Sequence, residues 1–335
     1  GSSAFHGCSK LAKIVIQSSL KSIGSSAFDG CCQLAELEIP QSVTSIGSSA
    51  FNGCVILSRI KIPSSVKSIK EKTFFGCSAI NQLMIPDSVS SIEPYAFKRC
   101  KCIKEIIIPK SVKSIGDSTF ENCSSLIKII IPFSVTSINK YAFSGCSKLT
   151  EIEIPSSVTF IGEYAFNECS CISKIVISGA VKSIEKRTFY GCSSLVQIMI
   201  PSSVTSIGAS AFERCSKLTE ITNLSSVTSI ESSAFNECIN LSTITNLPSN
   251  VLLGEKSFYN CNNLTQILLV KRFSNSKHTV ISPSLITIKS FSFYDCNKLT
   301  QFVFPPSVTS IGNNAFEKCS SLKQIKIPST VTNIG

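Results

Sequence analysis

Seventeen cysteines are the residues of this sequence with the most potential for chemistry, and fourteen of them occupy one place in a repeated phrase. The phrase "IGSSAFNGC" (46–54) has near-copies at 23–31, 115–123, 161–169 and 311–319. The repeated cysteines follow one another at 23 residues, with one interval of 35: Cys8, Cys31, Cys54, Cys77, Cys100, Cys123, Cys146, Cys169, Cys192, Cys215, Cys238, Cys261, Cys296 and Cys319. Such repetition is untypical of a catalytic site.

Four roles are open to these thiols: metal binding, nucleophilic catalysis, cross-linking and burial. Zinc sites use closely spaced ligand pairs, and a nucleophilic cysteine needs a base, but the two histidines, His6 and His278, do not recur with the repeat. Disulfides stay possible, because neighbouring coils would place cysteines about 5 Å apart. Free thiols are small, apolar and often buried, so the sequence favours a packed thiol ladder and predicts no metal, cofactor or catalytic residue.

Composition indicates a folded chain with a large core, since 43% of the 335 residues are hydrophobic and 16% are charged. No apolar run reaches the roughly 20 residues that a membrane-spanning helix requires. The formal net charge of +11 favours acidic partners such as sulfated glycans. The lysines are scattered, however, so a solvated surface is favoured over a polyanion site, and no specific nucleic-acid site is indicated.

The repeat reads approximately C-x-x-L-x-x-I-x-I-P-x-S-V-x-x-I-G-x-x-A-F-x-x-C. Alternation in "LTEIEIP" (149–155) predicts a short half-buried strand that ends at the proline. In "IGEYAFNEC" (161–169), Ile161, Ala165 and Cys169 are spaced by four, which predicts a short helical turn facing inward with Phe166. Two copies carry Asn223 and Asn246 at the inward strand position, where we expect a buried amide ladder.

One such coil cannot bury its own apolar edge, whereas stacked coils share a continuous core and a parallel sheet. The sequence therefore predicts a single α/β solenoid of about 14 repeats over residues 1–335, with a loop insertion at 270–281 where the interval is twelve residues longer. Because the chain begins and ends within a repeat, we expect it to be a fragment of a longer protein, open at both ends.

These three blocks, L-x-x-I-x-I-P, S-V-x-x-I-G and A-F-x-x-C at a step of 23, resemble the leucine-rich repeat of the Treponema or BspA-like type over essentially the whole chain. The resemblance implies a right-handed leucine-rich-repeat solenoid with a parallel sheet on the concave face and short helices or turns on the convex face. It also implies a surface protein of oral bacteria or of parasitic protists such as Trichomonas and Entamoeba, acting as an adhesin for host matrix, host cells or other microbes.

A row of outward strand positions, which we call the apolar stripe, is the first candidate binding surface. Exposed apolar rows flanked by polar residues are typical of protein-binding surfaces. The stripe consists of Met84, Ile107, Ile130, Glu153, Val176 and Met199, and a flanking polar row consists of Gln82, Glu105, Lys128, Glu151, Lys174 and Gln197. The alternative is that β-branched residues simply favour strands, although this does not explain the methionines. In the insertion, Lys271, Arg272, Lys277 and His278 are expected to meet an acidic partner.

These features predict a non-enzymatic protein that recognises a protein ligand through its concave face, and the resemblance implies that it does so at the cell surface. An intracellular, cytoplasmic interaction scaffold is one alternative, because free thiols are typical of a reducing compartment. A binder of polyanions such as sulfated glycans is another.

Overall fold

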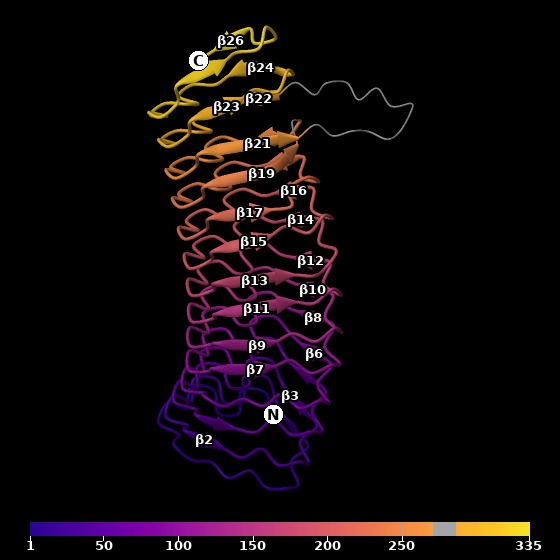
Figure 1. Cartoon of the computed structure of the whole chain (residues 1–335). Coiled ribbons are helices and arrows are strands. Elements are labelled where there is room, and N and C mark those ends of the chain that lie inside the picture. The colour runs from indigo at the N-terminus through magenta and orange to yellow at the C-terminus, as the bar shows by residue number, and fades with distance from the viewer. Residues whose placement is uncertain (249, 271–285) are drawn as a thin grey trace. The chain divides into compact units, whose positions relative to one another are not determined.

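The computed structural model describes residues 1–248, 250–270 and 286–335, and the chain divides into two compact units, 1–179 and 180–335. Each unit is a stack of coils that carry two rows of short strands (Figure 1). The first row holds β2 (Glu36–Leu37), β4 (Arg59–Ile60), β7 (Glu105–Ile107), β9 (Lys128–Ile130), β11 (Glu151–Ile154) and β13 (Lys174–Ile177) in the first unit, and β15 (Gln197–Met199), β17 (Glu220–Thr222), β19 (Thr243–Pro248), β21 (Gln266–Val270), β23 (Gln301–Val303) and β25 (Gln324–Lys326) in the second.

The second row is formed by the Ser-Ile dipeptide of each repeat and its equivalents. It holds β1 (Ser22–Ile23), β3 (Ser45–Ile46), β5 (Ser68–Ile69), β6 (Ser91–Ile92), β8 (Ser114–Ile115), β10 (Ser137–Ile138) and β12 (Phe160–Ile161) in the first unit, and β14 (Ser183–Ile184), β16 (Ser206–Ile207), β18 (Ser229–Ile230), β20 (Leu252–Leu253), β22 (Ile286–Ile288), β24 (Val308–Ile311) and β26 (Asn333–Ile334) in the second.

The strand pairs of the described residues are parallel, and their register follows the repeat. In the first row, Ile152 of β11 lies beside Ile175 of β13, one 23-residue step later. In the second row, Ile138 of β10 lies between Ile115 of β8 and Ile161 of β12. Each repeat position therefore forms a column along its unit, and the prediction of a solenoid of stacked coils with parallel strands is confirmed.

Columns of identical side chains fill the core of each unit. Phenylalanines from Phe5 to Phe166 stack in the first unit with ring centroids 5.3 to 5.6 Å apart. In the second unit the stack runs from Phe189 to Phe316 with centroids 5.2 to 5.5 Å apart. Offset stacking of this kind adds to the burial of each ring, so the phenylalanine column holds successive coils together.

The prediction of a helical turn in "IGEYAFNEC" is wrong, because the described residues contain turns and strands but no helix. In the matching segment of an earlier coil, Ala27 N donates to Gly24 O over 3.3 Å, whereas Phe28 N donates to Ala50 O of the next coil over 2.8 Å. Ser26 has a φ of 52°, which a type II turn requires at its third residue. Alternate amides thus bond within the coil and between coils, which an α-helix does not allow. The prediction that these side chains face inward is confirmed, since Ile161, Ala165, Phe166 and Cys169 are buried.

Twelve of the fourteen repeated cysteines are buried free thiols, as predicted, whereas Cys8 is exposed and Cys319 is half-buried. Cys146 Sγ donates to the carbonyl of Phe120 on the preceding coil over 3.2 Å, and the equivalent bond recurs along both units. Each thiol therefore ties two coils together while satisfying a buried carbonyl. Among the three cysteines outside the repeat position, Cys102 and Cys171 are exposed and Cys32 is half-buried.

The expected buried ladder of Asn223 and Asn246 is also wrong. Asn223 is half-buried and Asn246 is exposed. Their φ values of 66° and 59° lie in the left-handed region, which asparagine tolerates better than most residues. The chain turns at these residues, so that the next ones, Leu224 and Leu247, enter the core instead. Asn223 Nδ2 donates to Ile200 O over 2.7 Å and fixes this turn.

Replacing Asn223 with the isoleucine of the other copies should destabilise the second unit, although it restores the common repeat. A β-branched side chain at positive φ costs about 1 to 2 kcal/mol, and loss of the bond to Ile200 costs about 1 kcal/mol more. Urea unfolding of Asn223→Ile would measure this loss, with Asn223→Gly as the control that removes the bond without the backbone strain. A stability of Asn223→Ile above that of the wild type would contradict this assignment.

Candidate functional site: the outward face of the first strand row

The apolar stripe lies on the outward face of the first strand row, as alternation along the strands requires. In the first unit, Met84 is 84% exposed, Ile107 67%, Ile130 49% and Val176 40%. Met199 in the second unit is 67% exposed. The neighbouring Ile106, Ile129 and Ile175 are buried on the opposite face. The strands thus hold large apolar side chains in water although the core does not require them there.

The flanking polar row carries charges of opposite sign on successive strands. Glu105 of β7 lies in register with Lys128 of β9, and Glu151 of β11 lies in register with Lys174 of β13. Directly opposed charges of this kind favour strand pairing. Gln82 forms an isolated parallel bridge with Arg59, and Gln197 of the second unit lies in register with Glu220. The structure therefore places a charged row alongside the apolar stripe.

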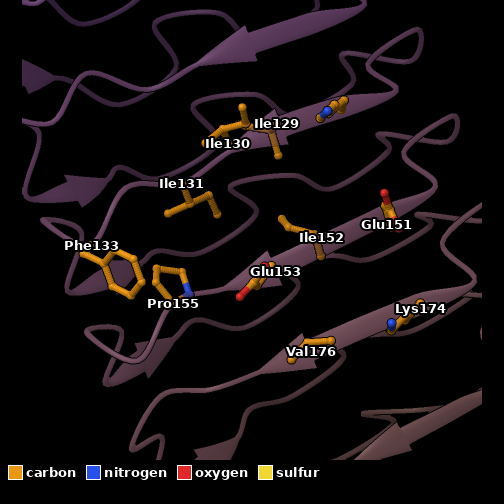
Figure 2. Close-up of a pocket in the computed structure, with 11 residues that line it drawn as sticks. Ile129, Ile130, Ile131, Phe133, Glu151, Ile152, Glu153, Pro155, Lys174 and Val176 are labelled. Atoms are coloured by element: carbon orange, nitrogen blue, oxygen red, sulfur yellow. The ribbon is translucent and has the colours of Figure 1, made fainter.

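A hollow of about 410 Å³ opens on this face at the last three strands of the first unit (Figure 2). Ile130, Glu153 and Val176 of the stripe line it, and Glu151 and Lys174 of the flanking row lie toward the other end of the same strands (Figure 2). Its lining residues are Lys128, Ile129, Ile130, Ile131, Phe133, Glu151, Ile152, Glu153, Pro155, Lys174 and Val176. The hollow joins the two predicted rows into one surface.

Phe133 is a lining residue that the sequence reasoning missed. Its ring is 75% exposed and lies beside Pro155 at one end of the hollow (Figure 2). The signal was available in the repeat: the residue after the proline is Gln41, Ser64, Asp87 or Lys110 in other copies, and it is aromatic here. An aromatic at a turn position that is otherwise polar indicates a contact surface rather than a packing need.

A second hollow of about 830 Å³ lies earlier on the same face. Met84 and Pro86 line it together with Leu37 and Ile60, and Arg59 at its edge pairs with Glu36 over 3.8 Å. The first unit therefore offers apolar contact area at both ends of its part of the stripe.

Lys271, Arg272, Lys277 and His278 lie outside the described residues. Within the described ranges, no group of three His, Cys, Asp or Glu side chains could hold a metal ion, and no helix is long and apolar enough to cross a membrane.

The buried thiols are poorly suited to nucleophilic chemistry. Burial raises the pKa of the Cys54 thiol to about 12, and it raises the pKa of Cys146 well above the ordinary value. Since the thiolate is the reactive form, these side chains stay protonated at neutral pH. The chemistry that the repeated cysteines first suggested is therefore not favoured where they are buried.

Comparison with known proteins places this architecture in a family. The family model of the BspA type leucine rich repeat region matches residues 1–127, 73–196, 115–222, 182–282 and 270–335. No curated protein matches the chain.

Solved bacterial structures share the fold. A leucine-rich repeat protein from Bacteroides ovatus is 29% identical with a TM-score of 0.68, over 94% of this chain and 76% of that one. A leucine rich cell surface protein from Faecalibacterium prausnitzii is 28% identical with a TM-score of 0.56, over 96% and 85%. Because the repeats, the stacked parallel strands and the family model agree along the sequence, this chain belongs to the family of BspA type leucine rich repeat regions.

Proposed function

We propose that this chain is a non-enzymatic recognition protein that binds a protein partner through the apolar stripe. Leucine-rich repeat proteins are typical protein-interaction scaffolds. The observation that carries the proposal is the exposure of Met84, Ile107, Ile130 and Val176 on one strand face of the first unit. Covering a side chain of this size contributes about 1.5 to 3 kcal/mol, so a few such contacts suffice for specific binding.

The composition of the surface favours a protein over other partners. An apolar centre beside a charged rim is the usual arrangement of a protein interface. Methionine adapts to irregular partners, which suits the positions of Met84 and Met199. By contrast, the flanking row carries both signs of charge, Glu105 and Glu151 as well as Lys128 and Lys174, whereas a polyanion site is expected to carry positive charge alone.

We further propose that the binding serves adhesion at the cell surface, toward host matrix, host cells or other microbes. The similar Faecalibacterium prausnitzii protein is described as a leucine rich cell surface protein, which supports this location. Beads coated with the chain should attach to a layer of epithelial cells, and soluble heparin should leave the attachment unchanged. Attachment that heparin abolishes would instead favour binding to sulfated glycans through the net charge of +11.

Four simultaneous substitutions in the stripe, which together we call the quadruple stripe variant, should abolish most binding. The probes are peptides that bind the immobilised chain and are selected from a displayed library of random 12-residue sequences. We expect the affinity for these peptides to fall at least tenfold in a variant that combines Met84→Ser, Ile107→Ser, Val176→Ser and Met199→Ser. A loss of about 1.4 kcal/mol of binding free energy suffices for that change. Fluorescence anisotropy of labelled peptides measures the affinity.

The matched control changes to serine four exposed apolar residues outside the first strand row, namely Val55, Phe160, Ile239 and Leu252, which are 41 to 51% exposed. This control should bind the peptides as the wild type does. If the control loses binding and the stripe variant keeps it, the stripe is not the recognition surface.

A further inference from the structure

The hollow on the strand face of the first unit has an acidic centre within apolar walls. Glu153 occupies the stripe position between Ile130 and Val176, and it is the one charged residue among the stripe positions from Met84 to Val176. Its side chain is exposed, and within the described part of the chain its carboxylate has no hydrogen bond or ion pair. A carboxylate placed among apolar neighbours is a site for a cation once a partner excludes water.

Glu151 lines the same hollow but has a different electrostatic setting. It lies in register with Lys174, and Lys128 also lines the hollow on the flanking row. Glu153 lies in register with the apolar Val176 instead. The other three charged lining residues, Lys128, Glu151 and Lys174, all belong to the flanking row, so Glu153 is the one charged group at the stripe position of the hollow.

The apolar walls favour a cation with a long aliphatic stem. Ile130 and Val176 border Glu153 along the stripe, and Pro155 lies between Glu153 and the ring of Phe133 at the end of the hollow (Figure 2). Side chains such as lysine and arginine cover apolar surface with their stems while the charged head reaches a polar partner. The volume of about 410 Å³ lies near the lower end of the range for ligand sites, as a hollow for one long side chain should.

We propose that this hollow receives an arginine side chain of the protein partner, a specificity that rests on the proposed recognition function. The guanidinium group donates two parallel hydrogen bonds to a carboxylate, here Glu153. Its flat face also stacks on aromatic rings, and Phe133 supplies an exposed ring at the same hollow. Lysine offers neither the paired hydrogen bonds nor the flat face, so arginine is preferred. The partner is thus a protein segment in which one arginine is flanked by apolar residues for the rest of the stripe.

The test uses peptides from the same random library and compares variants of the hollow. Peptides that bind the wild type should be enriched in arginine at one position. Glu153→Gln should weaken them at least tenfold, whereas Glu151→Gln, a matched change in the same hollow, should alter affinity less than threefold. Phe133→Ala should weaken them severalfold, and so should replacing the peptide arginine with lysine.

Exchanging the charges of Glu153 and the peptide arginine distinguishes a direct ion pair between them from a general loss of binding. A peptide in which the arginine is replaced by glutamate should bind Glu153→Arg better than it binds the wild type. These changes lie at exposed positions of the strand face and of the turn after it, so the coil should fold normally, which circular dichroism checks.

The outcomes distinguish the two proposals. Peptides that depend on the stripe yet show no arginine preference and tolerate Glu153→Gln would overturn the arginine site and leave protein recognition intact. Peptides that bind the quadruple stripe variant as tightly as the wild type would overturn the recognition function together with the arginine site.

Discussion

Raising the pH from 8 to 10 under reducing conditions should remove most of the stability of this chain. Burial raises the pKa values of the thiols in the cysteine column, to about 12 for Cys54 and for Cys123. The pKa is raised in nine deeply buried thiols: Cys54, Cys77, Cys100, Cys123, Cys146, Cys215, Cys238, Cys261 and Cys296. In the unfolded chain the same thiols ionise near pH 9.

The direction of the effect follows from proton binding. Below pH 9 the thiols are protonated in both states, and their contribution to stability is fully present. Between pH 9 and about 12 the unfolded chain releases protons that the folded chain keeps, so the free energy of unfolding falls as pH rises. Each thiol loses about 1.4 kcal/mol per pH unit in this window, and nine thiols together lose on the order of 10 kcal/mol by pH 10. That loss is comparable with the whole stability of a typical domain.

Urea unfolding at a series of pH values with a phosphine reductant measures the slope. The control is the double variant Cys146→Ala and Cys215→Ala, which has a buried thiol removed from each unit. Its starting stability will be lower, but its slope between pH 9 and 10 should be shallower by about two protons. A wild-type slope equal to that of the double variant would show that the buried thiols do not control the alkaline transition.

The fold could be predicted because every coil repeats the same apolar columns. A period of 23 residues fixes which side chains stack, and the burial of Phe166 and Cys169 follows from that period alone. The prediction of a helical turn was wrong because a spacing of four residues identifies which side chains face inward. It does not identify the partners of the backbone hydrogen bonds. In this coil the amide of Phe28 bonds to Ala50 of the next coil, which is a relation between repeats that one repeat does not reveal.

Asn223 and Asn246 show a second limit of reasoning from columns. Alignment placed them at an inward position, but a residue at positive φ reverses the direction in which the following side chain points. The replacement of the usual proline by Leu224 and Leu247 was the available sign that the core position had moved by one residue.

The candidate site was only partly predictable for a related reason. Strand alternation placed Ile130, Glu153 and Val176 on one outward face. Phe133 lies in the turn after the strand, where no periodicity specifies direction, and only the folded coil brings it to the same hollow.

Removing one ring from the phenylalanine column should cause the largest loss of stability of any single apolar truncation in the first unit. Phe143 is fully buried, and its ring stacks between those of Phe120 and Phe166 at 5.6 and 5.3 Å. Phe143→Ala leaves a cavity that neighbouring coils cannot close, because each is fixed by its own ring. We expect the free energy of unfolding to fall by about 3 to 5 kcal/mol.

Phe133→Ala is a matched control, since it removes the same side chain ten residues away, where the ring is 75% exposed. Its effect on stability should stay within about 0.5 kcal/mol, as for most surface substitutions. Urea unfolding compares the stabilities of the two variants. Peptide binding should show the opposite order of effects, because Phe133→Ala should weaken binding, whereas Phe143 has no exposed surface to contact a peptide. Equal losses of stability would mean that Phe133 packs in the fold. A clear separation would assign the buried phenylalanine to the scaffold and the exposed one to recognition.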